Sequence, residues 1–300
     1  MQPPLLSYIA FNRLGLTARN LSALLQNTID DFEMHIIDSN SKDNTWEYLQ
    51  DINDPRIKSK TRLEINSGPI YAVNLNLTKR KPEQYFIALD SDVIIYSWDW
   101  ISKFMRVFNT FPEVGLLGLK RASPYPVFTP EVIPMEKDGV KYEQLKYGRF
   151  GAPMDFIPGH CQFLRPELID IIGYWSEETH FGDAELSIRV NNYTPYKAGF
   201  VTDVVIDMTQ QIPCEACSVQ HKCKLDRVNE TCFSIRNSRY KNEAFASRFG
   251  WKGAAYFDDL SQGRRSVYCA SIHNPVSMSN NVYNLDWARE NFNFYMINAN

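Results

Sequence analysis

Short apolar segments alternate with amphipathic segments along the first third of the chain. Three segments have the length and apolar content of buried strands: residues 5–10, 32–37 and 85–89. Between the first two, residues 17–25 place Leu21, Leu24 and Leu25 on one helical face, and a second helix is expected over 46–49. The order strand, helix, strand, helix, strand predicts a parallel sheet of the α/β class.

The pattern continues more weakly downstream. Residues 98–108 have the apolar spacing of an amphipathic helix, and residues 114–119 have the composition of a buried strand. From 120 to 158 the periodicity fades and prolines recur, so we expect a long irregular segment. Such a segment is usually a functional loop or lid, and the alternative is a surface excursion that only packs against the sheet.

Polar side chains follow each of the first predicted strands. Asn12 and Arg13 follow the first strand, Asp38 the second, and Asp90 and Asp92 the third. In open α/β sheets ligands bind at the carboxyl ends of the strands, so these clusters are expected to converge on one edge. Two carboxylates at a buried strand end need a cation or hydrogen bonds, which favours a divalent metal with oxygen ligands. The alternatives are an ordinary acidic turn and, for Asp38, a cap of the following turn.

Four motifs stand out, at residues 7–13, 37–45, 66–68 with 72–74, and 89–92. In order and spacing they resemble the motifs of the family 2 glycosyltransferases of GT-A fold. The resemblance implies a mostly parallel central sheet flanked by helices. It also implies a catalytic domain over 1–210, with a nucleotide-sugar half at 1–95 and an acceptor half at 96–210. A Cys-rich insertion at 211–235 and a helical, aromatic segment at 236–300 that completes the active site would follow.

The resemblance extends to the acceptor side. Residues 159–167 and 172–175 look like the family's acceptor-side strand and helix, and 181–189 look like its acidic helix start. Gly182 stands where the family usually has the first acid, so the general-base role carries over to Asp183, with Glu185 as the second candidate. Proton removal from an attacking hydroxyl is the chemistry that such a carboxylate performs.

On the donor side, the resemblance implies a nucleotide-sugar and Mn²⁺ or Mg²⁺. The metal would be held by Asp90 and Asp92, with either Asp207 or His273 as a further ligand. The residues implied to bind the donor are Asn12, Arg13, Asp38, Asn66, Gly68, Asp90 and Ser91. A uridine or other pyrimidine nucleotide is the family's usual carrier, and inversion at the sugar is the expected outcome.

The acceptor is open to several readings. The family's breadth admits a glycan, a lipid-linked sugar, a protein side chain or a modified nucleic-acid base, and glycan ranks first by analogy alone. A nucleotidyltransferase shares this architecture, but the sequence Asp183-Ala184-Glu185-Leu186 favours sugar transfer. A catalytically silent scaffold that binds a glycan or protein through its cysteine module is the third hypothesis, and the intact Asp90, Asp92 and Asp183 argue against it.

Four of the six cysteines lie close together and open with a C-x-x-C pair: Cys214, Cys217, Cys223 and Cys232. With no export signal in view, this density favours a structural Zn²⁺ held by four thiolates, and His221 is a possible substitute for one of them. Disulfides and an iron–sulfur cluster are the alternatives. Cys161 and Cys269 are expected to be buried thiols.

The C-terminal third carries weaker signals. Residues 234–240 and 249–253 again look like the family, and Arg239 or Lys252 is either a pyrophosphate contact or a surface residue. The aromatic side chains of the tail suit stacking on sugars or packing of a C-terminal helix: Trp287, Phe292, Phe294 and Tyr295.

Composition agrees with an α/β enzyme. With 300 residues and 44% hydrophobic content, the chain can bury a sizeable core, and the net charge of −3 gives no sign of attraction to nucleic acid or membrane. The basic clusters at 79–81 and at Arg264 and Arg265 are expected to be solvated loops. No signal peptide and no transmembrane segment are evident, so we expect a cytoplasmic, soluble protein.

Overall fold

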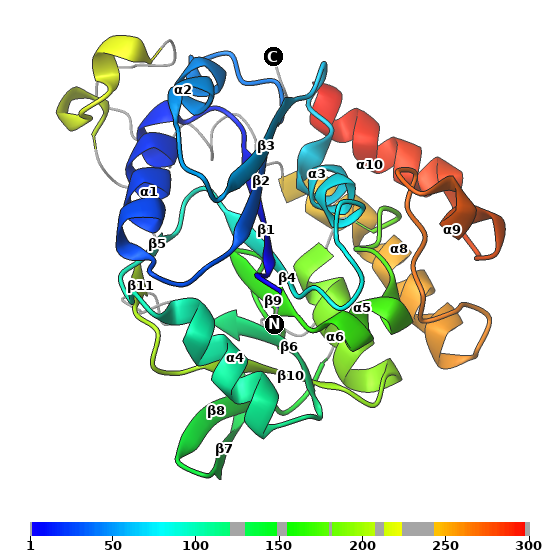
Figure 1. Cartoon of the computed structure of the whole chain (residues 1–300). Coiled ribbons are helices and arrows are strands. Elements are labelled where there is room, and N and C mark those ends of the chain that lie inside the picture. The colour runs from blue at the N-terminus through cyan, green and yellow to red at the C-terminus, as the bar shows by residue number, and fades with distance from the viewer. Residues whose placement is uncertain are drawn as a thin grey trace.

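The computed structural model describes six stretches of the chain: residues 2–120, 130–148, 155–179, 182–207, 213–223 and 243–297. Its centre is a nine-stranded sheet with the strand order β3-β2-β1-β4-β9-β6-β10-β8-β7. A two-stranded ribbon of β5 (Ile94–Ile95) and β11 (Ile206–Asp207) lies beside it (Figure 1). Among the described helices, none is long and apolar enough to cross a membrane.

The first half of the sheet is parallel, as the alternation of strands and helices predicts. Its strands are β1 (Leu5–Ala10), β2 (Glu33–Asp38), β3 (Ile57–Arg62) and β4 (Phe86–Asp90). β1 pairs in parallel with both β2 and β4, and β2 pairs in parallel with β3. The α/β class and the mostly parallel sheet are therefore confirmed, and the carboxyl ends of these strands share one edge.

The second half of the sheet is mixed. β9 (Cys161–Leu164) runs antiparallel between β4 and β6 (Val114–Leu119), and β10 (Lys197–Val201) is parallel to β6. β8 (Val140–Leu145) then pairs antiparallel with β10 and with the edge strand β7 (Val132–Lys137).

The β7–β8 hairpin corrects part of the prediction for 120–158. The prolines favoured an irregular segment, but Pro134 lies in an edge strand, where a missing backbone N–H is tolerated. Asp138 and Gly139 form the tight turn with φ of 52° and 74°, which matches the left-handed turn that suits hairpins. Residues 121–129 and 149–154 of the predicted segment lie outside the described residues.

Helices cover both faces of the sheet (Figure 1). On one face pack α1 (Leu14–Asn27), α2 (Thr45–Asp51) and α4 (Trp100–Thr110); on the other pack α3 (Gly68–Leu77), α5 (Pro166–Ile172) and α6 (Gly182–Tyr193). Successive side chains of a strand point to opposite faces. Accordingly Leu6 and Tyr8 of β1 enter the first core, whereas Leu5 enters the second.

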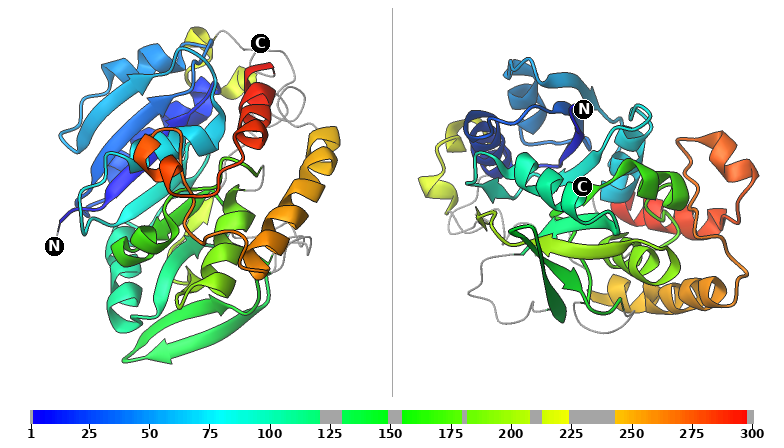
Figure 2. Two further views of the ribbon diagram at one scale, coloured as in Figure 1. Left: turned by 90° about the vertical axis from the view of Figure 1, so that its right-hand side faces the viewer. Right: turned by 60° about the horizontal axis from the view of Figure 1, so that its bottom comes forward.

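The C-terminal helices form an outer group beyond α3 and α6. They are α8 (Glu243–Ser261), α9 (Pro275–Ser279) and α10 (Leu285–Ile297), and Figure 2 shows them gathered on one side of the molecule. A third apolar cluster joins Ile188 of α6 to Tyr256, Phe257 and Leu260 of α8. α10 packs against α3, where the ring of Phe292 lies edge-on to that of Tyr71 with 5.1 Å between the centroids, as the packing alternative for the aromatic tail expects.

Candidate active site

The ends of β1 and β2 are tied together by Asn12. Its backbone N–H donates to Ser41 Oγ at 2.8 Å, and its Oδ1 accepts from the backbone N–H of Lys42 at 2.8 Å. Asn12 and Arg13 both have left-handed backbones, with φ of 51° and 60°. This conformation is uncommon outside glycine, and it occurs here where the chain leaves the carboxyl end of β1.

Next to this loop lies a row of buried polar atoms. Asp38 is fully buried, and its Oδ1 accepts from the backbone N–H of Ser41 at 2.9 Å, so it does cap the turn. Burial raises the pKa of the Asp38 carboxyl. Asp38 Oδ2, Ser39 Oγ and Ser67 Oγ are buried without a hydrogen-bond partner among the described residues. Because buried polar atoms are usually paired, these three atoms are available to a bound polar ligand.

Two further residues of the predicted donor set shape the start of α3. Asn66 Oδ1 accepts from the backbone N–H of Gly68 at 2.9 Å. Gly68 has φ of 77°, and a Cβ atom at this position would lie 2.7 Å from Tyr295 Cε2. The end of α10 therefore reaches the carboxyl edge of the sheet beside the buried polar atoms.

The motif at 90–92 places its three side chains differently. Asp90 ends β4 and is exposed, whereas Ser91 and Asp92 are buried. The Ser91 carbonyl accepts from Asn20 Nδ2 at 2.9 Å, which fixes the motif against α1. Arg13 Nη1 donates to Asp92 Oδ2 at 3.1 Å. One carboxylate is thus open to solvent and the other is held in an ion pair.

Asp183 lies at the start of α6 and is joined to the 90–92 motif through two neighbouring residues. Its Oδ2 accepts from the backbone N–H of Gly159 at 3.1 Å, and its Oδ1 accepts from that of Ala184 at 2.8 Å. The next residue, His160, accepts through its carbonyl from the Asp90 N–H at 3.0 Å. Burial raises the pKa of the Asp183 carboxyl, although these backbone bonds oppose the shift. A carboxylate with a raised pKa is a better proton acceptor.

Glu185, the second candidate base, lies in a different environment. It is 1% exposed and forms an ion pair with Arg189 at 2.5 Å, while Tyr256 donates to its Oε1 at 2.8 Å. Its carboxylate is therefore engaged with side chains inside the protein, whereas the partners of the Asp183 carboxylate among the described residues are backbone N–H groups.

The two rival metal ligands contact different elements of the fold. Asp207 is exposed and sits opposite Ile94 in the β11–β5 ribbon, and Ile94 follows Asp92 by two positions. His273 lies edge-on to Tyr71 of α3, with 6.3 Å between ring centroids, and burial lowers its pKa. Asp207 thus lies on a strand paired with the one that follows the 90–92 motif, whereas His273 lies in the C-terminal segment beside α3.

A divalent cation is compatible with this arrangement. Within the described stretches, no group of three or more His, Cys, Asp or Glu side chains could hold a metal ion by itself. Magnesium-type sites usually need only one or two carboxylates together with substrate phosphates, however. Asp90 and Asp92 provide such carboxylates at the edge where a ligand would enter.

The cysteine segment lies beside the β2–α2 loop. Cys214 is buried in the short helix η1 (Cys214–Ala216), and Cys223 follows η2 (Gln220–Lys222). The Lys222 carbonyl accepts from Asn44 Nδ2 at 2.8 Å, which docks the segment near the predicted donor edge. Cys232 and Arg239 lie outside the described residues, so the zinc site stays a prediction.

Two basic residues differ from their expected surface positions. Lys252 is 2% exposed and forms an ion pair with Glu290 at 2.5 Å, and its Nζ lies 5.9 and 5.8 Å from the ring centroids of Trp251 and Trp287. Arg265 was expected in a solvated loop, but it is 8% exposed. In each case a carboxylate that is distant in the sequence neutralises the buried positive charge. The residues next to the lysine or arginine in the sequence do not reveal this partner.

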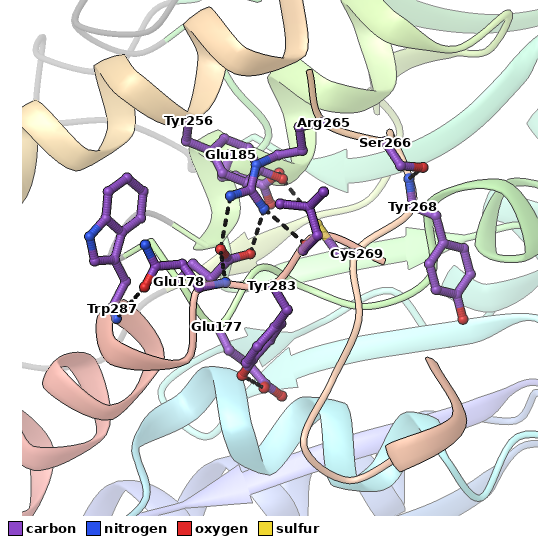
Figure 3. Close-up of polar contacts among 12 residues, drawn as sticks. Glu177, Glu178, Glu185, Tyr256, Arg265, Ser266, Tyr268, Cys269, Tyr283 and Trp287 are labelled. Atoms are coloured by element: carbon purple, nitrogen blue, oxygen red, sulfur yellow. Dashed lines mark hydrogen bonds and ion pairs between the residues drawn. The ribbon is translucent and has the colours of Figure 1, made fainter. Parts of the chain in front are cut away.

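Arg265 belongs to a buried polar cluster that the sequence does not reveal (Figure 3). Arg265 binds both carboxylate oxygens of Glu178, at 2.7 and 2.9 Å. The adjacent Glu177 accepts from Tyr283 and Ser271, each at 2.6 Å. Glu177 and Glu178 thus attach the C-terminal segment to the loop that precedes Asp183. Two adjacent acids after an apolar motif were the only signal of this role.

Comparison with known proteins gives the following matches. The family model described as glycosyl transferase family 2 matches residues 8–172. The mannosyltransferase PcManGT from Pyrobaculum calidifontis, solved with GDP-Man and Mn²⁺, aligns with a TM-score of 0.53 at 14% identity, covering 100% of this chain and 86% of that one. This match shows a shared fold.

A second set of solved structures covers less of either chain. TarS from S. aureus has a TM-score of 0.48 at 15% identity, covering 67% of this chain and 35% of that one. Its 1–349 portion, solved with UDP-GlcNAc, has a TM-score of 0.46 at 16% identity, covering 67% and 56%. The chain therefore spans about half or less of the length of these TarS chains.

Proposed function

The chain belongs to glycosyl transferase family 2, and from this premise we propose that it moves a sugar from a nucleotide-diphosphate sugar to an acceptor hydroxyl with inversion. The observation that carries the proposal is the link through Gly159 and His160, which brings the Asp183 carboxylate to the same edge as Asp90. A transferase needs a proton acceptor and a diphosphate site side by side.

The donor would bind along the carboxyl ends of β1, β2 and β4. Asp38 Oδ2, Ser39 Oγ and Ser67 Oγ are suited to hydrogen-bond the nucleoside, because they are buried and lack partners among the described residues. Asn12, Asn66 and Gly68 would shape this site through the backbone rather than through ionic contacts. PcManGT binds GDP-Man on the same fold, and a uridine carrier is the family's usual choice.

Asp90 and Asp92 would hold Mn²⁺ or Mg²⁺, with Asp207 the better-placed third ligand. Bound there, the cation would neutralise the negative charge that develops on the leaving diphosphate. His273 remains a proposal of lower rank, since it packs beside Tyr71. A structural Zn²⁺ on Cys214, Cys217, Cys223 and Cys232 is likewise kept as a proposal, and metal analysis of the purified protein tests it.

Asp183 would act on the acceptor. The acceptor oxygen forms a bond to the anomeric carbon as the bond from that carbon to the diphosphate breaks, and the hydroxyl proton passes to the Asp183 carboxylate. The N–H groups of Gly159 and Ala184 fix the carboxylate in place, and its raised pKa strengthens it as a base. Attack of the acceptor oxygen from the side opposite the departing diphosphate would invert the configuration at the anomeric carbon.

The acceptor class is tested together with the donor. Release of nucleoside diphosphate from a panel of nucleotide sugars, with Mn²⁺, Mg²⁺ or chelator, identifies the donor, and added glycans, lipid-linked sugars, proteins or nucleic acids identify the acceptor. We expect metal-dependent release from one donor. No release and no thermal stabilisation by any nucleotide sugar would instead favour the scaffold hypothesis.

The role of Asp183 is tested by Asp183→Asn. We expect transfer to fall about 10² to 10⁴-fold, the usual contribution of a general base, while donor affinity stays near that of the unmodified protein. The matched control is Asp138→Asn in the exposed β7–β8 turn, where asparagine tolerates the left-handed backbone. Equal activity of the two variants would remove Asp183 from the mechanism.

A further inference from the structure

The ion pair between Arg13 and Asp92 carries an inference beyond the proposed function. The two residues are 79 positions apart, and their side chains are only 14% and 6% exposed. Arg13 reaches Asp92 from a backbone with φ of 60° and ψ of 51° at the start of α1. A residue other than glycine adopts this conformation at a cost, so the surrounding structure holds Arg13 there.

The same carboxylate is the one that the family resemblance assigns to the metal. A guanidinium at 3.1 Å from Asp92 Oδ2 and a divalent cation on Asp92 would place three positive charges beside the two carboxylates of Asp90 and Asp92, which leaves an excess of positive charge. Like charges at such separations repel strongly where water is largely excluded. Arg13 and a cation are therefore competitors for Asp92 unless a further anion arrives.

We propose that Arg13 and the divalent cation are alternative counterions of Asp92, and that Arg13 turns to the donor's diphosphate when the cation binds. This inference rests on the proposed function, because it takes the ligand to be a nucleoside diphosphate. Without ligand, Arg13 neutralises Asp92, since a buried unpaired carboxylate is costly. With ligand, the planar guanidinium gains phosphate oxygens, which it binds well.

The exchange couples the two ligands. Binding of the cation alone displaces Arg13 from Asp92 with no phosphate to receive the guanidinium, so Mn²⁺ binds weakly in the absence of nucleotide. The diphosphate supplies that anion, so Mn²⁺ and nucleotide bind cooperatively, and by linkage each strengthens the other by the same factor. Asp90, which is exposed, gives the cation its first contact.

The test is Mn²⁺ titration by calorimetry, with and without UDP, on the unmodified chain and on Arg13→Gln. Without nucleotide, we expect Arg13→Gln to bind Mn²⁺ about tenfold more tightly, which corresponds to about 1.4 kcal/mol. UDP should raise the Mn²⁺ affinity of the unmodified chain, and it should raise that of Arg13→Gln by a factor about tenfold smaller. Other nucleoside diphosphates replace UDP if the donor panel selects them.

Arg62→Gln is the matched control. Arg62 lies at the same edge and pairs with Asp38, with 3.6 Å from Nε to Oδ1, so the substitution removes a nearby positive charge without releasing Asp92. The comparison is made without nucleotide, because Asp38 belongs to the proposed donor site. The Mn²⁺ affinity of Arg62→Gln should stay within about twofold, since its partly exposed guanidinium pairs with Asp38 rather than with Asp92. Asp92→Asn should lose Mn²⁺ binding. Arg13→Met, which keeps the aliphatic stem, replaces Arg13→Gln if the latter does not fold.

Three outcomes overturn the inference. If Arg13→Gln binds Mn²⁺ no better than the unmodified chain, Arg13 and Mn²⁺ do not compete for Asp92. If Arg62→Gln raises the Mn²⁺ affinity equally, the effect comes from the loss of any nearby positive charge and not from the release of Asp92. The inference is also wrong if the unmodified chain and Arg13→Gln both bind UDP but neither binds Mn²⁺. In that case the proposed sugar transfer would proceed without a metal. A chain that binds no nucleotide at all counts against the proposed function itself.

Discussion

Asp183 and Glu185 show how two carboxylates two positions apart on one helix acquire different chemistry. Among the described residues, Asp183 accepts only backbone N–H bonds, and it lies beside the loop that leads to Asp90. Glu185 is bound by Arg189 and Tyr256, which stabilise its charge. A substrate hydroxyl could reach the Glu185 carboxylate only by displacing one of these partners.

His35 gives the clearest pH prediction. Burial, with a smaller contribution from Lys79, lowers its pKa from 6.5 to about 4, and its Nδ1 lies 2.7 Å from Ser59 Oγ. A folded-state pKa below the unfolded value means that the unfolded chain binds the proton more readily. The contribution of His35 is therefore complete above the unfolded pKa and is lost as the pH falls from about 6.5 towards 4.

We expect His35→Gln to lessen this loss. Between pH 6.5 and 5, the melting temperature of the variant should fall less than that of the unmodified protein, measured by thermal melts in matched buffers. His221→Gln, at an exposed position, is the control and should follow the unmodified protein. Parallel melting curves for His35→Gln and the unmodified protein would contradict the assignment.

The sequence predicts a site residue when its partners are close to it along the chain, and it does not when they are distant. The clusters at Asn12, Asp38, Asp90 and Asp183 follow strand ends or begin a helix, so local pattern and family motif indicate them. The ion pair of Arg13 with Asp92 and the contact of Tyr256 with Glu185 join residues 79 and 71 positions apart. Such contacts depend on tertiary packing, which no local pattern contains.

Among the secondary-structure elements, the fully buried strand β6 could be predicted from the sequence, and the more exposed strand β3 could not. β6 was predicted with the bounds that the structure gives, because all of its residues are buried and its apolar run is continuous. β3 was not predicted, since the sequence Ile57-Lys58-Ser59-Lys60-Thr61-Arg62 is mostly polar and no residue of it is fully buried. An edge strand with one parallel neighbour leaves a weak signal of this kind.

The junction of α3 and α10 depends on Gly68. Its φ of 77° is costly for any residue with a Cβ atom, and that atom would lie 2.7 Å from Tyr295 Cε2 and Cγ. We expect Gly68→Ala to lower the free energy of unfolding by about 1–2 kcal/mol for the backbone alone, with a further loss from the displaced ring. Urea unfolding measures the total.

Gly139→Ala separates the two contributions. Gly139 has a similar φ of 74° in the β7–β8 turn, and a Cβ atom there would meet nothing within 4 Å. Gly139→Ala should therefore lower the free energy of unfolding by the backbone contribution alone, because the new methyl group overlaps with no other atom. If Gly68→Ala costs no more than Gly139→Ala, the ring of Tyr295 does not press on Gly68 in solution. Adding Tyr295→Ala to Gly68→Ala should otherwise recover the difference.

At the scale of the whole molecule, the C-terminal helices are attached to the catalytic half by charged groups as well as apolar ones. Glu177 and Glu178 lie between the strands and the segment at 265–291, and each binds at least two groups of that segment. Glu177 also accepts from Asn74 of α3 at 2.9 Å. The loop that leads to Asp183 is therefore held by both halves of the chain.

The pair of Glu178 and Arg265 tests this attachment. Both side chains are nearly inaccessible, at 3% and 5% exposure, and the guanidinium binds both carboxylate oxygens. Removing one partner of a buried pair leaves an uncompensated charge, so Arg265→Met should cost about 3–5 kcal/mol of unfolding free energy. The double variant Glu178→Gln, Arg265→Met should cost less than the sum of the single variants, because no unpaired charge remains.

Arg264→Met is the natural comparison, since the neighbouring Arg264 pairs with Asp258 in exposed positions and its loss should change stability little. Hydrogen exchange then locates the effect. In Arg265→Met the amides of 275–297 should exchange faster, and those of β1 and β4 should not, because the damage begins where the C-terminal segment meets Glu178. Uniform acceleration across the chain would mean that this buried pair supports the whole fold rather than the attachment of the C-terminal helices.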